Sequence, residues 1–150
     1  MPTYIDTILC EDIRPEMGNK VTLAGVFGEE MLVPQIPCVI PNFAIMQRWR
    51  LSNEEADRGG AGQFAVELQF PEGHANRFPA PMNPAQRGPN VTTISFIFKF
   101  INMAFPQRGE YRFRTYIDGR EANVYKFYVT PANAAAPQTA RPTIGFHPNQ

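Results

Sequence analysis

Cysteine and histidine, the side chains best suited to act as nucleophile, neutral-pH base or zinc ligand, are few in this chain of 150 residues. Its cysteines are Cys10 and Cys38, and its histidines are His74 and His147. A reactive thiolate needs an electropositive, partly exposed setting. Both cysteines stand in apolar, strand-like sequence, so we interpret them as buried, reduced thiols rather than a disulfide. Zinc requires at least three soft or imidazole ligands close together, so the sequence predicts no such metal site and no cofactor.

Other catalytic patterns are equally weak. Ser52 lies in a charged segment and Ser95 lies inside an apolar run, whereas a nucleophilic serine needs a sharp turn and a neighbouring base. The glycine-rich stretch 59–62 is not followed by the Lys and Ser/Thr of a phosphate-binding loop. We expect no catalytic residue and favour a protein that is not an enzyme.

Two alternatives stay open from the sequence alone. A small enzyme would need a cleft under residues 71–90, with His74 as a base beside a carboxylate such as Asp118 or Glu11. A calcium- or carbohydrate-binding sandwich would need acidic loop residues to converge at one end of the fold. The acidic residues concerned are Glu11, Asp12, Glu54, Glu55, Asp57 and Asp118.

A more specific arrangement of side chains lies in residues 109–130. Apolar residues alternate with polar ones on both sides of Asp118-Gly119, which is typical of a β-hairpin. A two-residue turn would place Phe113 opposite Val124 and would turn the apolar odd-numbered residues of the second strand toward solvent. We therefore predict a three-residue loop with Gly119 at positive φ, which matches Phe113 with those odd-numbered residues.

In that register one face of the hairpin collects cations and aromatic rings. Arg and Tyr are frequent at the centres of protein interfaces, so we predict that this face binds a protein partner or an anionic ligand. The alternative is a solvated sheet face on which arginine stems cover apolar surface. The predicted binding residues are Arg112, Arg114, Tyr116, Lys126 and Tyr128.

The elements that would position these side chains are strands. Phe, Val, Ile, Thr and Tyr are plentiful, and no window of a dozen residues sustains apolar residues at helical spacing. We predict an all-β fold, a single antiparallel β-sandwich of about seven strands that is Greek-key or Ig/C2-like, with Trp49 in its core. The strands are expected within residues 4–10, 20–27, 43–51, 64–70, 91–101 and 109–130, the last segment holding two.

Two proline-rich segments interrupt these strands. Residues 28–42 carry Pro34, Pro37 and Pro41, which remove donors from a strand ladder and indicate an edge or a crossover between sheets. Residues 71–90 are also rich in proline and form a longer connection than most in compact domains. We expect a functional or disordered loop there.

The domain is expected to comprise residues 1–130, followed by a Pro/Ala-rich flexible tail at residues 131–150. The tail has few large side chains whose burial would offset the entropy of ordering it. Its residues able to anchor it to the domain or to a partner are Ile144, Phe146 and His147.

Charge narrows the classes of partner and the compartment. Acidic and basic residues balance at 14 each, which argues against nucleic acid or an anionic membrane as the partner. Asp6, Glu11 and Asp12 interrupt the N-terminal segment where a signal peptide would be apolar. We therefore expect a cytoplasmic protein.

Two motifs near the N-terminus read ILCEDIR at residues 8–14 and GNKVTLAGVFG at residues 18–28. The last hairpin begins with GEYRFR at residues 109–114, before Asp118-Gly119. With these motifs the chain resembles an uncharacterised bacterial family, a domain of unknown function. The resemblance covers residues 5 to about 130 and implies a bacterial origin and a sandwich-like domain. It implies no catalytic residue, cofactor or substrate.

These observations lead us to expect a non-enzymatic protein-binding or assembly module. Its partner would be another protein or a second copy of the chain, because edge strands near residues 28–42 offer backbone groups for pairing between chains.

Overall fold

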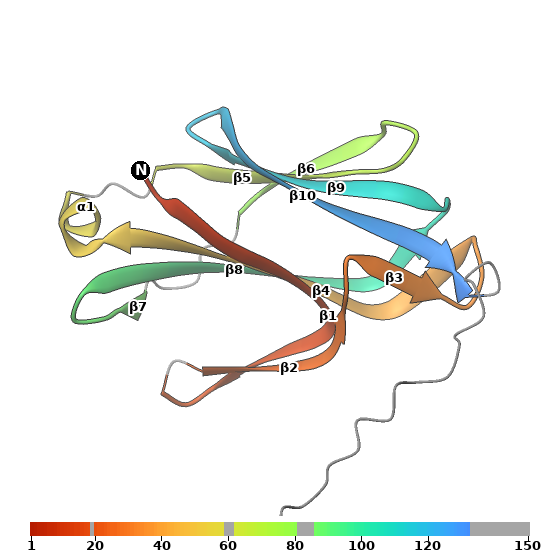
Figure 1. Ribbon diagram of the computed structural model, residues 1–150, viewed down its shortest axis with the longest axis horizontal. Helices are drawn as coiled ribbons and strands as arrows, with labels where there is room; N and C mark the ends of the chain where they lie inside the picture. Colours follow the sequence, from red (N-terminus) through yellow and green to blue (C-terminus); the bar gives the residue numbers. More distant parts are fainter. Residues whose placement is uncertain (19, 59–61, 81–85, 133–150) are drawn as a thin grey trace, which may run out of the picture.

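We analysed a computed structural model of the chain (Figure 1). It describes residues 1–18, 20–58, 62–80 and 86–132. These residues form ten strands and one short helix, α1 (Asn53–Asp57), which begins at a capping box between Ser52 and Glu55. No helix among them is long and apolar enough to cross a membrane.

The strands form two five-stranded sheets that pack face to face, as Figure 1 shows. The first sheet has the order β2 (Lys20–Phe27), β1 (Thr3–Glu16), β4 (Cys38–Ser52), β8 (Val91–Phe105) and β7 (Gln86–Arg87). The second has the order β3 (Glu30–Val33), β10 (Arg120–Pro131), β9 (Gly109–Ile117), β5 (Phe64–Gln69) and β6 (Ala75–Pro79). The expected all-β sandwich is confirmed, although β3 and β10 pair in parallel.

The main core lies between the sheets and is rich in aromatic rings, as the period-two alternation of the strands predicts. Trp49 is 2% exposed, so its predicted place in the core is confirmed. Tyr111 stacks on Phe127 with ring centroids 5.5 Å apart. Two polar side chains, Gln47 and Thr115, are also fully buried in this layer.

A second, smaller cluster lies on the outer face of the first sheet. It contains Cys10, Ile13, Ala44 and Met46, all at most 2% exposed. β1 pairs with β4 as far as Cys10 and continues alongside β2, and Leu23 of β2 packs against the cluster. Met46 does lie on the face opposite Trp49, as the alternation predicts, yet this cluster buries it.

The β9–β10 hairpin has the predicted pairing of inner residues but a different turn. Ile117 pairs with Arg120, so the loop has two residues, Asp118 and Gly119, both at positive φ. A register shift between Glu121 and Asn123 then brings Tyr125 opposite Phe113. The predicted three-residue loop is wrong, because a β-bulge supplies the extra residue that the prediction assigns to the turn.

Three short edge strands account for the difference between about seven expected strands and ten. Residues 71–90 are not one long loop, since β6 pairs with β5 and β7 pairs with β8. The proline-rich segment 28–42 does change sheets, from β3 in the second sheet to β4 in the first. The predicted flexible tail lies outside the described residues from residue 133 onward.

Candidate functional site

The structure brings the five predicted binding residues together on the outer face of the second sheet, on its neighbouring strands β9 and β10. Arg112, Arg114 and Tyr116 alternate along β9 with the buried side chains of Tyr111, Phe113 and Thr115. On β10, Lys126 and Tyr128 alternate in the same way with buried Phe127 and Val129. The side chains on this face follow from the corrected register, and the predicted grouping is therefore present: Arg112, Arg114, Tyr116, Lys126 and Tyr128.

Glu110 organises one end of this face. Its carboxylate accepts a hydrogen bond from Nε of Arg112 at 2.6 Å and one from the hydroxyl of Tyr128 at 3.1 Å. The bond from Arg112, followed by that from Tyr128, lowers the pKa of Glu110, and the same contact with Glu110 raises the pKa of Tyr128. Lys126 lies directly opposite Arg112 in the sheet, so Glu110 also offsets a repulsion between like charges.

Arg114 lies between Arg112 and Tyr116 on this face and is fixed by two neighbouring side chains. Its Nη1 lies 2.6 Å from Glu121 and its Nη2 donates to the side-chain oxygen of Gln69 at 3.0 Å. The bond to Glu121 is the main cause of a raised pKa of Arg114. Next to it, the guanidinium of Arg77 on β6 lies 4.2 Å from the ring centre of Tyr116, a cation–π contact.

These contacts change the chemistry expected of the face. Arg112, Arg114 and Arg77 each have a carboxylate partner, whereas no ion pair involves Lys126 among the residues that the structure describes. An incoming anion would compete with carboxylates already in place. The face therefore presents alternating charges and rings, with most of its cations already paired.

A small polar hollow borders this face. It has a volume of about 250 Å³ and is lined by Gln69, Phe70, Pro71, Glu110 and Arg112. Gly109 stands at its rim at φ 130, where an added Cβ would lie 3.3 Å from the ring of Pro71. The Glu110–Arg112 pair thus lines the hollow from the side of β9.

The structure does not assemble the groups that the enzyme alternative needs. His74 lies in the exposed turn between β5 and β6, with its ring 5.7 Å from that of Phe70. Asp118 lies at the opposite end of β5, where its carboxylate accepts the backbone N–H of Gln63 at 2.9 Å. The six residues of β5 lie between the two positions and span roughly 20 Å. Glu11 belongs to the other sheet.

The acidic loop residues of the calcium alternative are also distributed over the fold. Asp12 pairs with Arg14, Glu54 with Arg58, and Asp57 with Arg87. Within residues 1–18, 20–58, 62–80 and 86–132, no three His, Cys, Asp or Glu side chains gather as a metal site would require.

Both cysteines are free thiols. Cys10 is fully buried in the outer cluster, whereas Cys38 is half-buried. Burial raises the pKa of both thiols, which opposes the thiolate form that nucleophilic chemistry needs.

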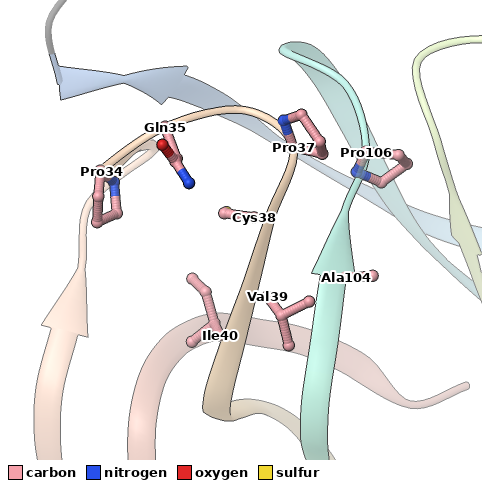
Figure 2. A pocket seen from close by; sticks show the side chains of 8 residues that line it. All are labelled: Pro34, Gln35, Pro37, Cys38, Val39, Ile40, Ala104 and Pro106. Carbon is pink, nitrogen blue, oxygen red and sulfur yellow. The ribbon is translucent and has the colours of Figure 1, made fainter.

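An apolar pocket that the sequence did not predict lies under the crossover from β3 to β4 (Figure 2). Its volume is about 460 Å³. Figure 2 shows Gln35, Cys38 and Ile40 projecting into the space beneath the loop that joins the two strands. The available signal was the proline content of residues 28–42, which indicates a rigid connection but not a hollow beneath it. The lining residues are Pro34, Gln35, Pro37, Cys38, Val39, Ile40, Ala104 and Pro106.

The model of a family of unknown function (DUF6941) matches residues 6–130 of the chain. No curated protein matches it. The matched range includes nearly all of both sheets, the hairpin face and the residues of the apolar pocket. The chain therefore belongs to this family.

Proposed function

We propose that this member of the family is a non-enzymatic protein-binding module, and that the outer face of β9 and β10 is its recognition surface. The proposal rests on one observation: five Arg, Lys and Tyr side chains share one sheet face, and contacts with neighbouring residues hold four of them, all but Lys126, in place. Side chains ordered before binding lose less conformational entropy when a partner docks.

The charge pattern favours a protein as the partner. The arginines of the face are matched by Glu67, Glu110 and Glu121, so it does not present the cluster of unpaired cations that nucleic acid selects. Tyr128, 47% exposed, offers both a ring and a hydroxyl, and exposed Lys126 offers a charge. We assign these two residues the largest share of the contact energy.

The test is affinity capture with the full chain from a lysate of its own organism. The variant Lys126→Glu/Tyr128→Ala changes two exposed side chains and leaves the Arg114 contacts intact. The matched control, Lys20→Glu/Val21→Ala, makes the same kinds of change on exposed positions of edge strand β2. We expect the first variant to lose at least ten-fold of a captured protein that the wild type and the control retain. Equal capture by all three chains would refute this surface.

A second copy of the chain is one possible captured protein, and light scattering identifies it directly. A wild-type mass of one chain, with a separate protein lost by the variant, supports recognition of another protein. A doubled mass that the variant reduces to one chain assigns the face to self-assembly.

A further inference from the structure

The apolar pocket lies close to the C-terminal end of β10. Pro131, the last residue of β10, pairs with Val33, the last residue of β3, and Pro34, which follows Val33, lines the pocket. Figure 1 shows the ends of β3 and β10 side by side, next to the loop that leads into β4. The part of the chain that the structure describes therefore ends close to the pocket, one residue after Pro131.

The walls of the pocket select an apolar occupant. Its lining consists of proline and aliphatic side chains with Gln35 and Cys38, and none of these residues carries a charge at neutral pH. Val39 is 58% exposed, although a valine side chain is more favourably buried by about 1.5–3 kcal/mol. A volume of about 460 Å³ is in the range of pockets that hold small ligands or a few large side chains.

The backbone beside the pocket favours an extended segment. β1 pairs with β4 only over residues 44–50 of β4. Residues 38–43 of β4 therefore pair only with β8 among the described strands. A strand edge of this kind can add a peptide through backbone hydrogen bonds, with alternate side chains entering a pocket.

Residues 133–150 contain two large apolar side chains, Ile144 and Phe146. They are separated by one residue, so on an extended backbone both point to the same side. The tether formed by residues 133–143 spans at most about 36–40 Å, more than the pocket's position beside the end of β10 requires. Closing a flexible loop of this length costs little more than closing a shorter one.

We propose that Ile144 and Phe146 occupy the apolar pocket of their own molecule, against Pro34, Cys38 and Val39. The short tether gives the segment an effective concentration in the millimolar range at its own pocket, which favours this occupant over a second copy at micromolar protein. The proposal is independent of the binding face on β9 and β10. It assigns the pocket to an internal peptide that an external partner would have to displace.

The half-buried thiol of Cys38 reports occupancy of the pocket. Cys10 is fully buried, so the rate of reaction of the folded chain with the disulfide reagent DTNB measures access to Cys38. We expect the full-length variant Ile144→Asp/Phe146→Asp to react about ten-fold faster than the wild type, because two carboxylates cannot enter an apolar pocket. The Cys38→Ser variant identifies the reacting thiol.

A matched control separates apolar docking from added charge. The variant Gln138→Asp/Asn149→Asp adds the same two charges outside the apolar pair and should react at the wild-type rate. A synthetic peptide of residues 140–150, added to the Ile144→Asp/Phe146→Asp variant, should slow the reaction again. A wild-type rate equal to that of Ile144→Asp/Phe146→Asp would overturn the proposal. So would a wild-type rate that falls as protein concentration rises, because protection would then come from a second copy.

Discussion

Gln47 is the residue whose substitution should affect the packing of the two sheets most. It is fully buried on β4. Its Nε2 donates to Thr7 at 3.0 Å, and its Oε1 accepts from Nε1 of Trp49 at 2.8 Å and from the hydroxyl of Thr115 at 2.6 Å. Because Thr115 belongs to the opposite sheet, this amide joins the two layers of the sandwich.

The substitution Gln47→Leu puts an apolar side chain of similar size in the same space and removes all three hydrogen bonds. Thr7 keeps a partner, since its hydroxyl also accepts from Tyr4 at 2.9 Å. The indole N–H of Trp49 and the hydroxyl of Thr115 are left unpaired in the core. An unsatisfied buried polar group costs about 1–3 kcal/mol. We therefore expect the free energy of unfolding to fall by about 2–6 kcal/mol, a large part of the 5–15 kcal/mol typical of a domain.

Guanidinium denaturation followed by fluorescence of the single tryptophan measures this loss. The midpoint should fall with the slope m unchanged. The double variant Gln47→Leu/Thr115→Val should recover about 1–3 kcal/mol relative to the sum of the single changes, because it removes one orphaned hydroxyl. Gln63→Leu, on an exposed glutamine, should cost less than about 0.5 kcal/mol. A loss below about 1 kcal/mol for Gln47→Leu would show that the network does not join the sheets.

Three further outcomes follow from the same structure. Gly119→Ala should destabilise by about 1–2 kcal/mol in urea denaturation, since φ is 78 there and the added Cβ meets open space. Burial raises the pKa of Tyr111 to about 12, so its contribution to stability is complete below pH ~10 and is lost as pH rises toward 12. Tyr111→Phe should therefore lose less stability than the wild type between pH 9 and about 11.5, and equal losses would refute this. Ile13→Ala should cost about 2–5 kcal/mol in thermal melts, against less than about 0.5 for exposed Val26→Ala.

The sequence was sufficient for those features that depend on local alternation. Side chains in a strand point to opposite faces with a period of two, so the alternation by itself assigns residues such as Phe113 to the core and Arg112 to the surface. The same rule places Gln47 on the inner face with Trp49, and it places the five hairpin residues on one surface. Proline content likewise indicated that residues 28–42 change sheets.

The tertiary structure decided what those side chains meet. One hydrogen-bond partner of Gln47 is Thr115, 68 residues further along the chain. No local sequence pattern predicts this pairing. The carboxylates that pair with Arg112 and Arg114 come in part from another strand, because Glu110 lies on β9 and Glu121 on β10, so the alternation does not show that these cations are already paired. The two-residue turn with a bulge and the three-residue loop give the same inner pairing, which is why hydrophobic pattern alone did not separate them.

The hairpin face could thus be predicted from the sequence, whereas the apolar pocket could not. A sheet face is defined by the alternation of polar and apolar residues along one or two neighbouring strands, and this alternation can be read directly from the sequence. The pocket exists because β1 leaves β4 at Cys10 and the crossover spans the space beside Cys38 and Ile40. Its walls come from the loop between β3 and β4, from β4 and from the end of β8, and only the packing of the two sheets brings those segments together.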